Sequence, residues 1–213
     1  MRVERFVLGP LETNCYLIYD KGEAIIVDPG WHEGVELIIN RVKTLGLRVK
    51  ALIATHGHFD HIAGAVQARK LLGYRVPFLI HEGDAPLLES AGAVAREWLG
   101  VSIEVPEPDR FIDENTTLKV GNEELQVIHT PGHSPGSIVL VGSRYAITGD
   151  TIFAGSVGRT DLPGASWAKL KESLRRLANM LPPATILYPG HGPYTTLDDE
   201  LAWNPFLREA LNN

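Results

Sequence analysis

The stretch Thr55-His56-Gly57-His58-Phe59-Asp60-His61 places four side chains that can bind a metal within six residues. It directly follows Val49–Ala54, an apolar run typical of a buried strand. A solvent-exposed polar loop is the weaker explanation, because such groups have no structural reason to cluster unless something neutralises them. We therefore expect a metal site at the end of this strand.

Three later loops repeat the arrangement of a potential ligand placed just after a strand. These ligands are His133, Asp150 and His191. Taken singly, each has an ordinary explanation as a loop histidine, a turn former or a helix cap. Taken with the first cluster, they predict one shared site, because the loops at the carboxyl ends of strands in an open α/β sheet converge.

The combined ligand set is larger than one metal ion requires. A structural zinc takes four ligands, and a catalytic zinc takes about three and a water. Five imidazoles and two carboxylates therefore predict two divalent ions, most simply Zn, with Fe or Mn as alternatives and calcium disfavoured. Two ions ~3.5–4 Å apart can share a hydroxide, lower its pKa and stabilise the oxyanion that forms when it attacks a carbonyl or phosphoryl centre. The reaction class this predicts is hydrolysis.

The order and spacing of these residues resemble the metallo-β-lactamase fold superfamily, from Thr13-Asn14-Cys15-Tyr16-Leu17-Ile18 through to His191. The resemblance implies an α/β fold, a four-layer αββα sandwich, in a single domain over residues 1–213 without a separate C-terminal helical domain. It also implies how the ligands divide. One metal would be held by His56, His58 and His133, the second by Asp60, His61 and His191, and Asp150 would bridge them.

Within the superfamily, the pair Asp60-His61 together with Asp150 and His191 resembles the thioesterase branch. True metallo-β-lactamases are exported and commonly carry a different pattern at the position of Asp150. Three further stretches are similar to short glyoxalase II-like hydrolases, namely Gly158–Asp161, Gly190–Thr196 and Asn204–Leu207. The implied reaction is attack of a metal-bridging hydroxide, oriented by Asp60, on the carbonyl of a small thioester.

Full-length glyoxalase II proteins continue into a helical region whose basic residues help to hold glutathione. This sequence ends soon after Leu207. We therefore expect weak selectivity for glutathione thioesters.

Two other functions remain open at this stage. Persulfide dioxygenases resemble the same scaffold, and by that resemblance His56, His133 and Asp150 would hold one iron and leave positions open for oxygen and substrate. A non-catalytic metal-binding scaffold is the alternative from another class, and the intact ligand set argues against it. The 26 acidic and 20 basic residues give a net charge of −6, which disfavours a nuclease or any other nucleic-acid partner.

Several residues outside the ligand set have two interpretations. Arg159 would either anchor a carboxylate of the substrate or pair with Asp161. Tyr194 would either reach a bound ligand or pack near the last helix. Trp98 and Trp203 are expected to be packing anchors.

Composition and length bound the class of protein. A chain of 213 residues with 44% hydrophobic and 22% charged residues is an ordinary globular domain. Its longest apolar runs, such as Ile138–Val141, are far below the ~18 residues of a membrane helix, and Met1–Pro10 does not resemble a secretory signal. Cys15 is the only cysteine, so an intrachain disulfide and a multi-cysteine metal site are excluded, and we expect a cytoplasmic protein.

The apolar pattern predicts a mixed order of strands and helices. Short strands at Val3–Leu8, Cys15–Tyr19 and Ala24–Asp28 open the chain, and a helix follows Gly34. An irregular segment at Ala91–Asp113 is expected to cap the site. The other expected helices are Ala63–Leu72, Trp167–Met180 and a last one that ends near Leu211.

Overall fold

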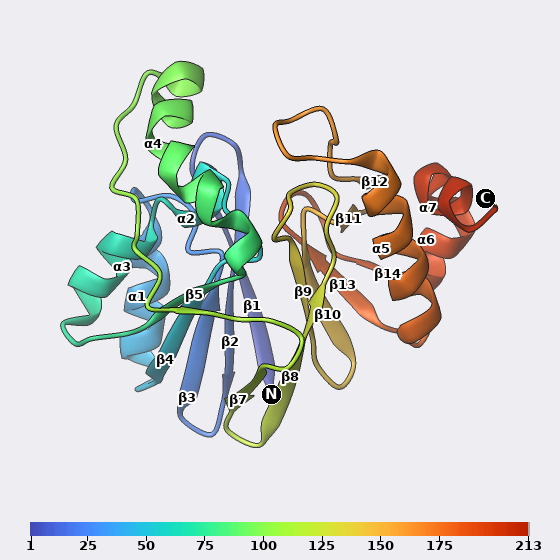
Figure 1. Cartoon of the computed structure of the whole chain (residues 1–213). Coiled ribbons are helices and arrows are strands. Elements are labelled where there is room, and N and C mark those ends of the chain that lie inside the picture. Colours follow the sequence, from blue (N-terminus) through green and yellow to red (C-terminus); the bar gives the residue numbers. More distant parts are fainter. Residues whose placement is uncertain (213) are drawn as a thin grey trace.

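Two six-stranded sheets pack face to face in the computed structural model, which describes residues 1–212 (Figure 1). The first sheet has the order β1 (Arg2–Leu8), β2 (Thr13–Asp20), β3 (Glu23–Val27), β4 (Arg48–Ile53), β5 (Phe78–Ile80) and β6 (Arg110–Phe111). The second has the order β14 (Thr195–Thr196), β13 (Ile186–Pro189), β10 (Tyr145–Gly149), β9 (Ile138–Val141), β8 (Glu123–His129) and β7 (Thr117–Val120). A small hairpin pairs β11 (Ile152–Phe153) with β12 (Ser156–Val157).

Helices cover the outer face of each sheet. The first sheet carries α1 (Val35–Thr44) and α3 (Ala65–Leu72), and the second carries α5 (Trp167–Met180), α6 (Leu197–Trp203) and α7 (Pro205–Asn212) (Figure 1). Two more helices, α2 (Phe59–Ile62) and α4 (Ala85–Leu99), lie at the end where the strand loops meet, with a short 3-10 turn (Glu82–Asp84) leading into α4. The expected α/β class and four-layer αββα sandwich are confirmed.

Strand β2 shows how the sequence builds three core layers. Successive side chains of a strand point to opposite faces, so a strand between two packed layers is apolar throughout. Tyr16 and Ile18 belong to the core between the two sheets, whereas Cys15 and Leu17 belong to the core beneath the helices of the first sheet. A third core lies between the second sheet and its helices. Cys15 is fully buried in the core beneath the helices of the first sheet.

The region around α4 corrects the expected secondary structure. The segment Ala91–Asp113 is expected from the sequence to be irregular, but its first part belongs to the regular helix α4. This helix has a proline in its first turn, where proline is tolerated. It ends at Gly100, whose φ of 69° is the left-handed conformation that glycine tolerates. The expected helix at Ala63–Leu72 is preceded by a separate helix, α2. The two helices are separated at Ala63 and Gly64. At Gly64 the backbone packs so closely on the neighbouring loop that a Cβ atom would lie 2.3 Å from the carbonyl oxygen of Pro29.

The two sheets are joined directly at one end of the sandwich. The backbone N–H of Ile138 donates to the carbonyl of Thr55 over 2.9 Å, and that of Asn14 donates to the carbonyl of Gly190 over 2.7 Å. The first bond joins the end of β4 to the start of β9, and the second joins the start of β2 to the end of β13. None of the helices in the described residues combines the length and apolar character needed to cross a membrane.

Candidate metal centre

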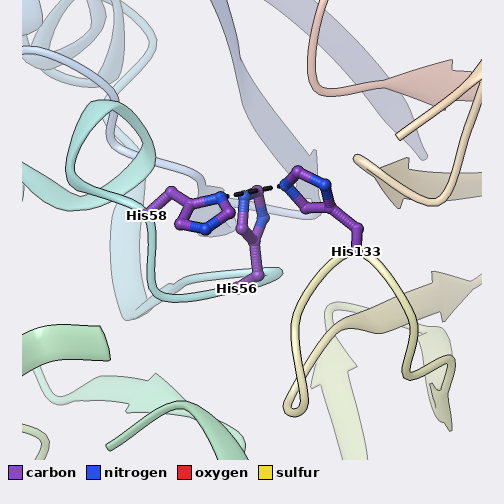
Figure 2. A group of neighbouring side chains, drawn as sticks. All are labelled: His56, His58 and His133. Carbon is purple, nitrogen blue, oxygen red and sulfur yellow. Dashed lines mark hydrogen bonds between the residues drawn. The ribbon is translucent and has the colours of Figure 1, made fainter. Parts of the chain in front are cut away.

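Three histidines from two separate loops face one another at the seam between the sheets. His56 and His58 follow β4, and His133 follows β8. Their rings converge in Figure 2, where Nε2 of His133 lies 2.9 Å from Nδ1 of His58. The nitrogen atoms of the three residues lie within 4.8 Å of one another, so they can hold one ion.

A second group lies beside the first. Nε2 of His61 is 3.4 Å from a carboxylate oxygen of Asp60 and 3.3 Å from Nε2 of His191. Asp150 lies between the groups, since its two oxygens are 3.5 Å from His61 Nε2 and 3.5 Å from His133 Nε2. The structure thus brings together all seven residues that the sequence predicts as ligands.

The outer nitrogen of four histidines is held by the surrounding protein. Nδ1 of His61 lies 3.0 Å from a carboxylate oxygen of Asp28, and Nδ1 of His56 lies 3.1 Å from Oγ1 of Thr55. The same atom of His133 faces the carbonyl of Arg159, and that of His191 faces the carbonyl of Leu11. Such contacts fix the ring orientation of these four histidines and leave Nε2 free to bind a metal.

Two buried polar atoms of the cluster lack a hydrogen-bond partner among the described residues, which indicates that a cation fits there. Nε2 of His56 and Oδ1 of Asp150 are buried and have no hydrogen-bond partner within the described chain. Unpaired buried polar atoms are costly, and a ligand commonly satisfies them. A borderline divalent ion matches this donor set of imidazoles and carboxylates.

Electrostatics favour the metal-binding forms of His56, His58 and Asp60. Burial lowers the pKa of His58 to about 4 and that of His56 well below its usual range, and the neighbouring histidines add to both shifts. Burial opposes ionisation of Asp60, but His61 and His191 outweigh it and lower the pKa of Asp60. Neutral imidazoles and an ionised carboxylate are the forms that bind a metal.

The carboxylates around His61 favour positive charge at that side chain, where a cation would bind. Burial opposes protonation of His61, yet Asp60, Asp150 and Asp28 outweigh it and raise its pKa to about 10.

A buried carboxylate ties the two ligand loops of Figure 2 together. Asp84 accepts hydrogen bonds from the backbone N–H of Gly57, over 2.8 Å, and from Oγ of Ser134, over 2.7 Å. It also accepts one from the backbone N–H of Gly136. Gly57 separates His56 from His58, and Ser134 follows His133. Asp84 therefore fixes the positions of these three histidines relative to one another.

The cluster forms the floor of an open cavity of about 660 Å³. Five of the seven expected ligands line it, and His56 and His61 lie deeper. Phe59, Leu87, Val94 and Trp98 form one wall, while Leu11, Phe153, Val157, Leu162 and Pro163 line the rest.

The expected residues outside the ligand set fall in different places. Arg159 lines the cavity and forms a two-point ion pair with Asp161, at 2.7 Å for both bonds. Tyr194 is 63% exposed, packs near Tyr188, and is not among the described residues that line the cavity. Trp203 is 80% exposed, so its expected role as a packing anchor is wrong.

Other residues of the site were missed by the sequence interpretation. Thr13 donates from Oγ1 to Asp60 over 2.7 Å, and Asp28 holds His61 and Thr55. Asp28 carries the same signal as the predicted ligands, a carboxylate directly after a buried strand. Nothing in the local pattern distinguishes Asp84 or the cavity-facing side chains of α4.

The comparisons with known proteins agree with this geometry. Residues 8–191 match the family described as the metallo-beta-lactamase superfamily. The chain belongs to this superfamily. The hydroxyacylglutathione hydrolase GloC of Haemophilus influenzae is a superfamily relative at 36% identity, over 97% of this chain and 98% of its own.

Two solved structures are similar over nearly the whole chain. The B3 metallo-beta-lactamase BLEG-1 has a TM-score of 0.87 at 34% identity, covering 97% of this chain and 99% of its own. TTHA1623, in a di-iron-bound form, has a TM-score of 0.85 at 39% identity, covering 96% and 100%.

Proposed function

We propose that the protein hydrolyses small thioesters, in the manner of glyoxalase II, with two divalent metal ions. The observation that carries the proposal is the pair of ligand groups joined by Asp150 at the floor of an open cavity. The 36% identity to a hydroxyacylglutathione hydrolase supports the choice of a thioester. Zn is the first choice of metal. The di-iron form of a neighbour at 39% identity makes Fe the first alternative, ahead of Mn.

In this proposal one ion is held by His56, His58 and His133, and the second by Asp60, His61 and His191, with Asp150 shared. When bound, two such ions supply Lewis-acid polarisation of a carbonyl and make water more acidic.

Asp60 is the residue placed to orient the attacking water. It is 8% exposed, lines the cavity and is fixed by Thr13 on one side and by His191, at 3.3 Å, on the other. Its lowered pKa keeps it ionised at neutral pH, so its oxygen can accept a hydrogen bond that orients the water.

The leaving group needs little help from the protein. A thiol has an unperturbed pKa of ~8.5, so a thiolate departs without full protonation. A cysteine nucleophile is excluded, because Cys15 is fully buried among apolar residues. The net charge of −6 supports a small-molecule substrate over nucleic acid. The single cysteine, which allows no intrachain disulfide, supports the cytoplasmic setting of this proposal.

The test is release of free thiol from S-lactoylglutathione by Zn-loaded protein without oxygen. We expect steady turnover, and its loss in Asp60→Ala. Oxygen uptake by iron-loaded protein with glutathione persulfide, together with negligible thiol release, would replace the proposal by the dioxygenase. If the fully metal-loaded protein catalyses neither reaction, the non-catalytic metal-binding scaffold would replace the proposal.

A further inference from the structure

Helix α4 carries more apolar surface than its packing on the core requires. Leu88 and Ala95 are buried against the core of the first sheet. Leu87 and Trp98 line the cavity, as does Val94, which also packs against that core, and Trp98 remains 47% exposed. These residues form the cavity-side edge of one broad apolar face, and this edge is left uncovered by the core, so it is available to an apolar guest.

The opposite wall of the cavity is apolar as well. Phe153, Val157 and Leu162 line it and are only partly buried. Two facing apolar walls above a polar floor form a slot of about 660 Å³. A hydrophobic group placed there gains free energy in proportion to the apolar area that it removes from water.

The charges around the slot do not favour an anionic guest. Among the described residues, Glu97 and Arg159 are the charged side chains that line the cavity outside the ligand set. Arg159 is already paired through two bonds with Asp161 and lies over the ring of Trp98, 5.8 Å from its centre. The hydroxyl of Ser90 is within hydrogen-bonding distance of the backbone carbonyl of Leu87, at 3.1 Å.

We infer that the preferred substrate is a thioester with an apolar acyl group, which lies between α4 and the Phe153–Leu162 wall. This inference rests on the proposed thioester hydrolysis and adds its substrate class. The thiol carriers of metabolism, such as glutathione and coenzyme A, end in charged groups, so the carrier points through the mouth of the cavity into water. The acyl chain takes the slot, because a buried methylene gains free energy there and a buried charge would lose it.

The experiment compares acetyl, butanoyl and hexanoyl thioesters of N-acetylcysteamine with S-lactoylglutathione on Zn-loaded protein. Full burial of one methylene raises affinity by roughly fourfold, and hexanoyl has four more methylenes than acetyl. Even partial burial of this chain should raise kcat/KM at least about tenfold from acetyl to hexanoyl. Hexanoyl should also exceed S-lactoylglutathione. A flat series, or a preference for S-lactoylglutathione, would overturn the inference while leaving thioester hydrolysis intact.

Binding separates this inference from the proposed function. Ketone analogues, in which a methylene replaces the thioester sulfur, cannot be hydrolysed, and calorimetry measures their dissociation constants. Tighter binding with each added methylene supports the apolar slot even if no thioester is turned over, and in that case the proposed hydrolysis fails alone. Equal affinities across the series contradict the slot.

Wall variants locate the effect. Val94→Ser and Leu162→Ser, on opposite walls, should lower the hexanoyl-to-acetyl ratio of kcat/KM by about fivefold or more, which is the loss of one to two buried methylenes. Val7→Ser is the matched control, because Val7 is 50% exposed on β1 and does not line the cavity. Melting curves and metal content confirm that each variant is folded and loaded. An unchanged ratio in both wall variants, at full loading, contradicts the assignment.

Discussion

Gly190 has no side chain, and this leaves room for Asp150 and His61 in the shared site. A Cβ atom at this position would lie 2.1 Å from Oδ1 of Asp150 and 2.7 Å from Cε1 of His61. Its backbone N–H also donates to the carbonyl of Gly149 over 2.8 Å, which keeps the β13 loop against β10. The glycine is therefore required by the closeness of its neighbours, since its φ is not among the positive values.

The first prediction follows at this position. Gly190→Ala should displace Asp150 and His61 and weaken metal binding by at least about tenfold, roughly 1.4 kcal/mol, measured by calorimetric titration with Zn. Gly92→Ala is the control, because its Cβ would meet nothing closer than 3.8 Å. That substitution should leave binding unchanged and stabilise α4 by up to about 1 kcal/mol. Wild-type affinity in Gly190→Ala would show that Asp150 and His61 are not both ligands.

The second residue-scale prediction concerns Asp84. Asp84→Ala leaves buried donors at Gly57, Ser134 and Gly136 without their acceptor. We expect a loss of about 2–4 kcal/mol in the free energy of unfolding, measured with urea. Asp198→Ala, at an exposed position of α6, should stay within about 0.5 kcal/mol of the wild type. Equal stabilities of the two variants would contradict the role given to Asp84.

At the element scale, β1 is tied to α1 by a charged pair. Glu4 accepts hydrogen bonds from Nε of Arg41, over 2.7 Å, and from the hydroxyl of Tyr19, over 2.6 Å. The hydrogen bond from Arg41 is the main cause of the lowered pKa of Glu4, against the opposing effect of burial.

The pH dependence of stability follows from the direction of that shift. The folded pKa of Glu4 lies below its unfolded value of ~4.3, so its contribution is present above pH ~4.3 and is lost as the pH falls through the folded pKa. Glu4→Gln should therefore lose less stability than the wild type between pH 6 and pH 3, as measured by urea unfolding at each pH. An identical acid loss in both proteins would show that the pair does not contribute.

The elements also show how far the sequence determines the structure. Strand ends and the metal-ligand loop could be predicted, because apolar runs and dense histidines are local signals. Helix α4 could not, since Pro86 and Gly92 interrupt the pattern. Its role as a cavity wall depends on contacts across the fold, as do Thr13 and Asp84. The exposure of Tyr194 and Trp203 likewise depends on how the whole chain folds, and local sequence does not show it.

At the scale of the whole molecule, the candidate metal site joins the two sheets. His56, His58, Asp60 and His61 follow a strand of the first sheet, whereas His133, Asp150 and His191 follow strands of the second. Ions bound by both sets would link the halves of the sandwich, so folding and metal binding are thermodynamically coupled.

Metal removal should therefore destabilise the protein. At free Zn 100 times the dissociation constant, one site adds about 2.7 kcal/mol to the free energy of unfolding, and chelation removes it. Melting curves at increasing Zn concentration should shift upward, and a large excess of chelator should reverse the shift. A melting temperature that does not depend on Zn would contradict a site shared by the sheets.

The most direct test of the account is the number of ions that each chain binds. Metal-stripped protein is titrated with Zn in a calorimeter, and the metal content of the loaded, gel-filtered protein is measured by elemental analysis. We expect two ions per chain in the wild type and loss of most of both in Asp150→Ala, because the shared carboxylate is removed. A single ion at saturation, with unchanged binding in Asp60→Ala, would contradict the two-metal site and the thioester hydrolysis built on it.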